Sequence, residues 1–296
     1  MPARRPAEAS RSARAAGQVF DGIAALYDRA RPGSPAGTVA DLLALCQVAR
    51  TSRILEIGCG TGQLTRHLAP SGARIVCLEP GPQLATIARQ NLAEWENVEV
   101  VTATFEDFEA PASSVDVVVS ATAFHWIDPN VSFSKAARVL DEDGRLALVT
   151  NAHSRGGTHA EPRMTNSMRA LHRRVAPELG EWQFPTTEEI VHGATHGGDI
   201  LAVWTSVERK MPDAPAVAHL FGPPTVKTYP WTVAYRKDDF LAMLASQSQY
   251  ALMEPGRRDR LFDGIGALVD ENLGGTVTKD YVAVLAVAAN SRQAAR

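Results

Sequence analysis

The 296-residue sequence contains little cysteine. Cys46, Cys59 and Cys77 are its three cysteines, and no two of them have CxxC spacing. An odd number of cysteines without that spacing argues against both a disulfide framework and a structural zinc site. We therefore predict that the protein holds no metal and that it works in a reducing, cytoplasmic compartment.

Long apolar runs and an excess of charge of one sign are also missing. The longest apolar runs, such as YVAVLAVAA at 281–289, are far shorter than the roughly 20 residues of a membrane-spanning helix. The formal net charge of −3 gives no overall attraction to nucleic acid or to an anionic membrane. We therefore expect neither nucleic acid nor a membrane as a partner. We also expect a small-molecule substrate, and a protein that is a monomer or a homodimer.

The first residues, 1–17, are rich in Arg, Ala and Ser and lack the apolar core of a signal peptide. We predict a disordered, solvated tail, although the same composition would also suit a transit peptide. Two helices are expected next. The first lies within 19–35 and is ended by prolines and a glycine. The second is amphipathic and lies at 36–49.

From residue 53 onward, the pattern alternates between apolar strands and helices. Continuous apolar strands interleaved with helices predict a parallel sheet with helices on both faces, a doubly wound α/β domain. We assign 18–150 to this core, 151–200 to a helical insertion that forms a substrate lid, and 201–296 to strands and helices that complete the sheet. The predicted strands are 53–57, 74–79, 98–102, 115–120, 145–150, 200–210, 226–236 and 281–289, and the predicted helices are 62–70, 81–94, 130–141 and 258–273.

A glycine-rich turn follows the first strand, in the stretch RILEIGCGTGQLTRHL at 53–68. Gly58, Gly60 and Gly62 give the pattern GxGxG, which lets a ligand approach the backbone closely. Gln63 stands where dinucleotide-binding enzymes place their third glycine, which disfavours a NAD-dependent oxidoreductase. No Lys-Ser or Lys-Thr pair follows, so a nucleotide-binding P-loop is excluded.

Two acidic residues narrow the ligand further. Glu56 lies inside the end of the first strand, where it would repel a pyrophosphate but suit an ammonium group. Glu79 ends the next strand, where a carboxylate accepts hydrogen bonds from ribose hydroxyls in this type of fold. Glycines for close approach, an acid for an amine and an acid for ribose together indicate an adenosyl amino acid.

With these residues, the sequence resembles class I S-adenosylmethionine (SAM)-dependent methyltransferases of the type 11 group. The segments that carry the resemblance are LEIGCGTG (55–62), CLEP (77–80), TATFEDF (102–108), SATAFHWID (120–128) and ARVLDEDGRLALV (137–149). The F-H-W signature and TYPWTVAYRKDDFLAMLASQSQY (228–250) resemble a subgroup related to trans-aconitate methyltransferases. The resemblance implies a Rossmann-like sheet of seven strands, mostly parallel with an antiparallel last strand, and SAM as the cofactor with S-adenosylhomocysteine (SAH) as its product.

The resemblance also implies which residues bind SAM. In the family, the glycine turn contacts the methionine part, the acid after the second strand holds the ribose, and the third-strand turn meets the adenine. In the family, an aspartate at this turn forms a hydrogen bond with the adenine amine. Thr104 stands at that position here, so we predict that the backbone amide of Phe105 contacts the adenine instead. The implied cofactor residues are Tyr27, Arg31, Glu56, Gly58, Cys59, Gly60, Gly62, Glu79, Pro80, Leu84, Thr104, Phe105, Glu106, Ser120 and Ala121.

The activated methyl group belongs to the cofactor, so the protein must align the acceptor and, where needed, remove a proton. His125 follows the fourth strand, at the edge where open α/β sheets bind ligands, and is the candidate base. The alternative is that it only hydrogen-bonds the backbone and shapes the pocket, because a carboxylate acceptor needs no base. Trp126, Trp182 and Phe184 are candidates for substrate contact.

We predict a carboxylate oxygen of a small molecule as the acceptor. A hydroxyl or amine of a specialised metabolite, or a peptide carboxyl, is the alternative. A nucleic-acid methyltransferase is disfavoured, because SATA stands where such enzymes carry N-P-P-Y or D-P-P-Y. A SAM-binding protein without catalysis is a further alternative.

Overall fold

The computed structural model describes residues 20–180, 183–208, 211 and 214–291, so the predicted tail at 1–17 lies outside the described residues. The helices before the first strand are α2 (Ala24–Ala30) and α3 (Ala36–Leu45). The sheet strands are β1 (Arg53–Ile57), β2 (Arg74–Leu78), β3 (Val98–Val101), β4 (Val115–Ala121), β5 (Leu140–His153), β6 (Thr225–Arg236) and β7 (Thr276–Ala289). The helices after β1 are α4 (Thr65–Leu68), α5 (Pro82–Asn91), α6 (Pro129–Val139), α7 (Pro162–Val175), α8 (Thr187–Thr195), α9 (Ile200–Glu208), α10 (Lys237–Ala245), α11 (Ser248–Ala251) and α12 (Pro255–Leu273).

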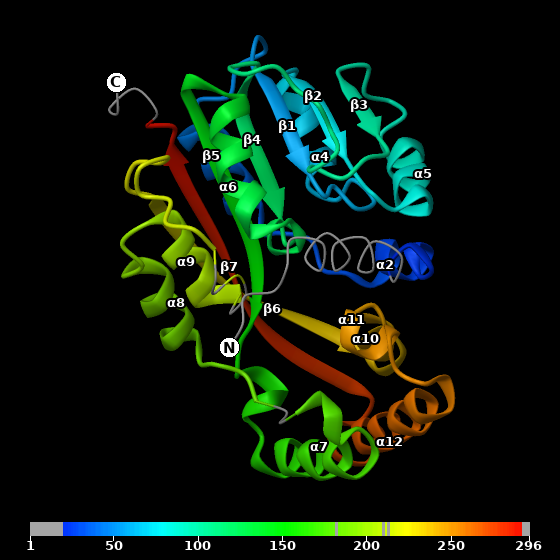
Figure 1. The fold of residues 1–296 in the computed structure, drawn as a ribbon. Coiled ribbons are helices and arrows are strands. Elements are labelled where there is room, and N and C mark those ends of the chain that lie inside the picture. Colours follow the sequence, from blue (N-terminus) through cyan, green and yellow to red (C-terminus); the bar gives the residue numbers. More distant parts are fainter. Residues whose placement is uncertain (1–19, 181–182, 209–210, 212–213, 292–296) are drawn as a thin grey trace.

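The seven strands form one sheet in the order β3-β2-β1-β4-β5-β7-β6 (Figure 1). The strands β1 to β5 pair in parallel, and β7 is antiparallel to both of its neighbours, β5 and β6. The predicted α/β fold, mostly parallel with an antiparallel last strand, is confirmed. In such a sheet, the carboxyl ends of β1 to β4 meet at one edge, where ligands of open α/β folds bind.

Helices cover both faces of the sheet because its strands are apolar on both sides. On β5, Leu146 and Leu148 pack against one core cluster, whereas Ala147 and Val149 pack against the other. The helices α6, α8 and α9 bury apolar side chains in the first cluster, and α3, α4 and α5 do so in the second. The period-two alternation of buried side chains therefore fixes the register of the strands between two helical layers.

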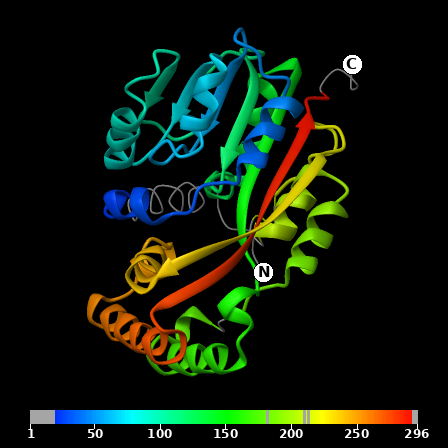
Figure 2. The ribbon, with the colours of Figure 1, turned by 180° about the vertical axis from the view of Figure 1, so that it is seen from behind.

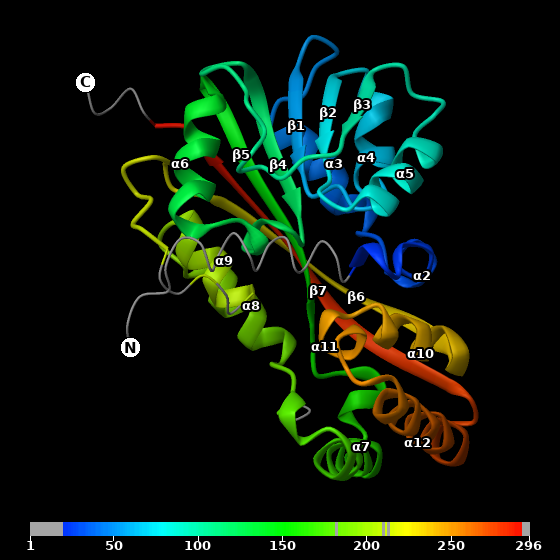
Figure 3. The same ribbon diagram turned by 45° about the vertical axis from the view of Figure 1, so that its right-hand side comes forward.

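The strands β5, β6 and β7 are longer than the others and carry a second packed region. Their far ends leave the upper part of the molecule and meet α7, α10 and α12, as Figures 1 and 2 show from opposite sides. A third core cluster fills this region, with Met168 from α7, Phe240 from α10, Ile265 from α12 and Tyr281 from β7. Figure 3 shows α2 between this lower region and the carboxyl ends of β1 and β2.

One predicted strand is wrong, because residues 200–208 form helix α9. Val, Ile and Trp favour strands, but the buried residues Ile200, Val203 and Trp204 follow the i, i+3, i+4 spacing of a helix. Asp199 also accepts a hydrogen bond of 2.8 Å from the backbone N–H of Ala202, which caps the helix start.

Other predicted bounds needed smaller corrections. The helix predicted at 62–70 begins only at Thr65, because Gly62 has a φ of +83° that no α-helix contains. The strand predicted at 145–150 extends over 140–153 as β5. The segment 151–200 contains α7 and α8, and its role as a lid stays a prediction. No helix in the described part of the chain is long and apolar enough to cross a membrane.

Candidate functional site

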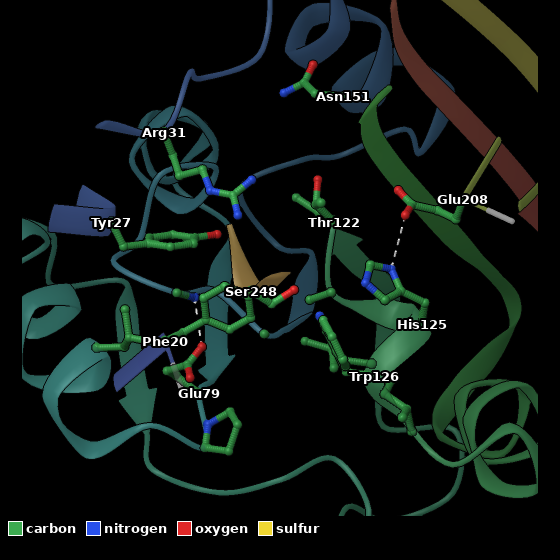
Figure 4. A pocket seen from close by; sticks show the side chains of 18 of the residues that line it. Phe20, Tyr27, Arg31, Glu79, Thr122, His125, Trp126, Asn151, Glu208 and Ser248 are labelled. Atoms are coloured by element: carbon green, nitrogen blue, oxygen red, sulfur yellow. Dashed lines mark hydrogen bonds and ion pairs between the residues drawn. The ribbon is translucent and has the colours of Figure 1, made fainter. Parts of the chain in front are cut away.

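A cavity of about 440 Å³ opens at the carboxyl ends of β1, β2 and β4. Its walls come from segments that are far apart in sequence: the strand ends, α2, the end of α9 and the start of α11 (Figure 4). Thirteen of the predicted site residues line it: Tyr27, Arg31, Gly58, Gly60, Glu79, Pro80, Leu84, Thr104, Phe105, Glu106, Ala121, His125 and Trp126.

The glycine turn leaves β1 with a backbone that side chains would obstruct. Gly58 and Gly60 have φ values of +69° and +58°, which L-residues rarely adopt. A Cβ on Gly58 would lie 2.4 Å from the Cβ of Ala123, and one on Gly60 would lie 3.4 Å from the Tyr27 ring. Gly62 has a different role, because its Cβ would meet the Leu92 side chain at 2.8 Å and the residue does not line the cavity.

The carboxylate of Glu79 joins the second strand to this turn. Its Oε2 accepts a hydrogen bond of 2.9 Å from the backbone N–H of Gly60, and Oε1 accepts one of 2.9 Å from Gly81. Burial raises the pKa of Glu79 to about 7, and the two N–H groups oppose that rise. Each carboxylate oxygen keeps a further lone pair, so Glu79 can also accept a ribose hydroxyl.

Glu56 lies behind the turn and is 1% exposed. Thr65 donates a hydrogen bond of 2.8 Å to its Oε2, and burial raises the pKa of Glu56 to about 7. It lines a second, smaller cavity of about 80 Å³, together with Gly58, Cys59 and Arg31. Glu56 and Cys59 therefore stand beside the larger cavity rather than in it.

Helix α2 covers the cavity from the side opposite the sheet. The Arg31 guanidinium lies 5.2 Å from the centroid of the Tyr27 ring, and its Nη2 donates a hydrogen bond of 2.9 Å to the Ser246 carbonyl. Burial raises the pKa of the Tyr27 hydroxyl. Phe20 makes edge-to-face contacts with Tyr27 and Trp126 at centroid distances of 5.7 and 6.1 Å. No sequence motif marks Phe20.

The third-strand turn is held by its own side chains. Thr104 donates a hydrogen bond of 2.9 Å to Asp107, and Glu106 accepts one of 3.0 Å from the Asp128 backbone. Phe105 is 2% exposed, and the Lys135 ammonium lies 5.2 Å from its ring centroid.

After β4, Ser120 and Ala121 differ in their surroundings. Ser120 is fully buried and donates a hydrogen bond of 2.8 Å to the Ile57 carbonyl, so it supports the β1 end and does not line the cavity. Ala121 does line it. The next residue, Thr122, has a φ of +54°, an unusual value for a β-branched residue, and it also lines the cavity.

His125 and Trp126 lie on the short 3-10 helix η2 (Phe124–Trp126). The Nδ1 atom of His125 is 3.4 Å from Oε2 of Glu208, and the His125 side chain is 2% exposed. Thr150 donates a hydrogen bond to the other oxygen of Glu208. Figure 4 shows the imidazole between Glu208 and Trp126 at the wall of the cavity.

The two predicted substrate residues of the insertion are not in the described wall. Trp182 lies outside the described residues. Phe184 packs against His153, with ring centroids 5.8 Å apart, and the Lys279 ammonium lies 4.2 Å from its ring. Its neighbours Gln183 and Pro185 line the cavity instead.

Several lining residues were missed because no local pattern points to them. Most of them come from β5, the end of α9 and the segment around α11, and they reach the cavity only through the tertiary fold. They are Asn151, Glu208, Gln247, Ser248 and Gln249. Phe20 precedes α2, and Thr122 follows β4 with a positive φ that the sequence does not show. In the part of the chain that is described, no group of three or more His, Cys, Asp and Glu is arranged to hold a metal ion.

The residues present fit an adenosyl amino acid. The Gly58 and Gly60 backbone forms a cradle that a Cβ would fill, and Glu79 stands at its edge. The buried Nε of Arg31 has no hydrogen-bond partner among the described residues, so it is available to a carboxylate. Glycines, carboxylates and guanidinium thus converge on one cavity.

Comparison with known proteins agrees with this geometry. Residues 55–148 match the protein family described as "Methyltransferase domain". An uncharacterized methyltransferase of Mycobacterium tuberculosis is 35% identical over 132 residues, which are 45% of this chain and 51% of that protein. A protein of Saccharomyces cerevisiae described as a probable S-adenosylmethionine-dependent methyltransferase is 29% identical over 126 residues, 41% of this chain and 43% of that protein. The chain thus spans about half the length of the curated relatives it matches.

Among solved structures, a candidate methyltransferase from an antibiotic biosynthesis pathway of Anabaena variabilis has a similar fold. The TM-score is 0.52 with 19% identity, over 87% of this chain and 98% of that one. The similarity at this identity concerns the fold alone. Residues 55–148 therefore match a methyltransferase domain, and the chain as described has a Rossmann-like α/β fold.

Proposed function

We propose that this protein is a SAM-dependent methyltransferase that acts on a small molecule. The observation that carries the proposal is the hydrogen bond from the Gly60 backbone to Glu79, inside a cavity that opens from the matched methyltransferase domain. This contact brings the carboxylate that we propose as the ribose ligand directly beside the glycine turn. The yeast relative, described as a probable SAM-dependent enzyme, supports the choice of cofactor.

The chain's own residues would bind and orient the cofactor. Gly58 and Gly60 admit its methionine part, Glu79 accepts from its ribose, and Arg31 pairs with its carboxylate. When bound, SAM supplies a methyl group on a positively charged sulfur, which is already activated for displacement. Phe20 and Trp126 close the side of the cavity, which excludes water from that group.

The acceptor end of the cavity favours an uncharged small molecule. The sequence resemblance suggested a carboxylate acceptor, which an arginine or lysine side chain would bind most strongly. Among the described cavity-lining residues, Arg31 is the one arginine or lysine, and it suits the cofactor. None of Arg155, Arg163, Arg169, Arg173 and Arg174 of the insertion lines the cavity.

Three narrower features of the proposal rest on sequence. Kinship with the trans-aconitate methyltransferase subgroup rests on Phe124, His125 and Trp126 and on the segment 228–250. A cytoplasmic location rests on three free cysteines, which the structure buries. We also propose that the protein works as a monomer or homodimer without a nucleic-acid partner.

The experiment that tests the function is a release assay. The purified protein is incubated with SAM and a metabolite extract, and SAH is quantified by mass spectrometry. We expect SAH to accumulate with the extract and to stay at background without it. If SAH stays at background although the protein binds SAM, the chain is a SAM-binding protein without this activity.

A further inference from the structure

We propose that Glu208 positions His125 as a general base, and that the methyl acceptor is therefore a neutral hydroxyl group. This inference rests on the proposed function, because it assigns the acceptor class of the same cavity. Glu208 carries no motif, and its segment was expected to be a strand. It reaches the cavity because α9 ends there.

The geometry joins three side chains in a row. Nδ1 of His125 is 3.4 Å from Oε2 of Glu208, an ion-pair distance rather than a hydrogen bond, and Oε1 of Glu208 accepts a hydrogen bond from the Thr150 hydroxyl. The side chains of His125 and Glu208 are 2% and 12% exposed, so little water competes with this pair. The Trp204 ring lies on the imidazole with a centroid distance of 6.2 Å and an interplanar angle of 29°.

This arrangement determines which ring nitrogen can act as the base. A carboxylate facing Nδ1 favours the tautomer with its proton on Nδ1, which leaves Nε2 free of a proton and able to accept one. The same carboxylate stabilises the imidazolium that forms when Nε2 takes a proton. Glu208 acts through His125, so it is a positioning residue rather than a catalytic one.

The proposed step balances without any further reactant. The acceptor oxygen gives its proton to Nε2 of His125 and an electron pair to the methyl carbon, whose bond to sulfur breaks with its electron pair staying on sulfur. The imidazolium then releases the proton to solvent. A carboxylate acceptor would leave this base without a task, because it has no proton to lose at neutral pH.

The other carboxylates of the cavity are already engaged. The ionisable residues that line it besides His125 and Glu208 are Tyr27, Arg31, Glu79, Glu106 and His153. Glu79 is held by backbone N–H groups, and Glu106 accepts from the Asp128 backbone. An ammonium acceptor would compete for Glu208, whose two oxygens already face His125 and Thr150, so a hydroxyl fits better.

The first test measures the His125 ring by NMR during a pH titration. The ring signal is assigned by its absence in His125→Asn, and the titration is repeated for Glu208→Gln. Glu188→Gln on α8 is the matched control, because it removes the same charge from an exposed site. We expect Glu208→Gln to lower the His125 pKa by about one to three units, and Glu188→Gln to leave it unchanged.

The second test identifies the methyl product. Methyl-labelled SAM is incubated with the protein and a metabolite extract, and the products are treated with mild alkali. Methyl esters release labelled methanol, whereas methyl ethers do not, and methylated amines are retained on a cation exchanger at acidic pH. We expect methyl ethers, and we expect His125→Asn to lower the rate about 10²- to 10⁴-fold.

Each outcome decides the inference. An unchanged His125 pKa in Glu208→Gln overturns the positioning role, and an ester or amine as the main product overturns the hydroxyl acceptor. Calorimetry with SAH separates the proposed function from the proposed base. If the wild-type protein does not bind SAH, the proposed function is contradicted, whereas the His125–Glu208 pair is not.

Discussion

The backbone N–H of Gly60 and the carboxylate of Glu79 are joined by a hydrogen bond of 2.9 Å. This bond connects the turn after β1 to the end of β2, so the two neighbouring strands hold one ligand-binding backbone between them. A second N–H, from Gly81, holds the other oxygen of the same carboxylate at 2.9 Å. The carboxylate is therefore oriented before any ligand arrives, which lowers the entropy cost of binding.

Replacing Gly58 by Ala should damage both the fold and cofactor binding. The new Cβ would lie 2.4 Å from Ala123 Cβ at a φ of +69°, and such backbone strain costs about 1–3 kcal/mol. We expect a lower free energy of unfolding in urea and at least tenfold weaker SAH binding by calorimetry. Gly33→Ala is the control, because nothing described lies within 4 Å of its Cβ. Equal SAH affinity in the two variants would contradict the role of the turn.

Replacing Glu79 by Gln should weaken SAH binding while keeping the fold. The glutamine oxygen can accept a hydrogen bond from only one of the two backbone N–H groups, those of Gly60 and Gly81. Its NH₂ group would face the other N–H and cannot accept a hydrogen bond from it. It also loses the charge that strengthens a hydrogen bond from a ribose hydroxyl. We expect about 10- to 100-fold weaker binding in calorimetry, a loss of about 1.4–2.8 kcal/mol. Glu99→Gln, at an exposed position of β3, should bind SAH as the wild type does.

The stability contribution of Glu56 should depend on pH. Burial raises its pKa from the ordinary 4.5 to about 7, so its stabilising contribution is fully present below pH 4.5 and is lost as the pH rises to about 7. Glutamine does not titrate, so Glu56→Gln removes this pH-dependent loss of folding free energy, which amounts to about 3 kcal/mol at most. We expect the variant to gain more free energy of unfolding over the wild type at pH 8 than at pH 5. An equal difference at both values would be evidence against a raised pKa, and Glu99→Gln is again the control.

Replacing Arg31 by Lys should weaken SAH binding although the charge is kept. The guanidinium donates through Nη2 to the Ser246 carbonyl and keeps Nε for a ligand, whereas one ammonium cannot reach both in a fork geometry. We expect a several-fold rise in the SAH Kd, with the Kd for adenosine, which lacks the amino-acid part, almost unchanged. Parallel losses for both ligands would show that Arg31 only supports α2.

The sequence allowed us to predict that the proposed cofactor residues meet in one cavity, because these residues follow consecutive strands. Gly58, Gly60 and Glu79 follow consecutive strands, and parallel strands bring their carboxyl ends to one edge whatever the rest of the chain does. Gly62 does not line the cavity, and spacing alone does not separate a glycine that lines it from one that packs against Leu92.

The cavity wall that we propose to face the acceptor could not be predicted in this way. Asn151, Glu208 and Gln247 reach the cavity from the extended end of β5, the end of α9 and the residue before α11. Their positions depend on long-range packing of the β5–β7 region, which has no sequence signature. The β-branched and aromatic residues of 200–208 also concealed a helix, and with it the residue that pairs with His125.

Calorimetric titration of the wild-type protein with SAH, with NAD as the comparison ligand, tests the proposed cofactor most directly. We expect saturable binding of one SAH per chain, competition by SAM, and no heat with NAD, because Gln63 replaces the third dinucleotide glycine. No binding of SAH by the folded protein, or saturable binding of NAD in its place, would contradict it.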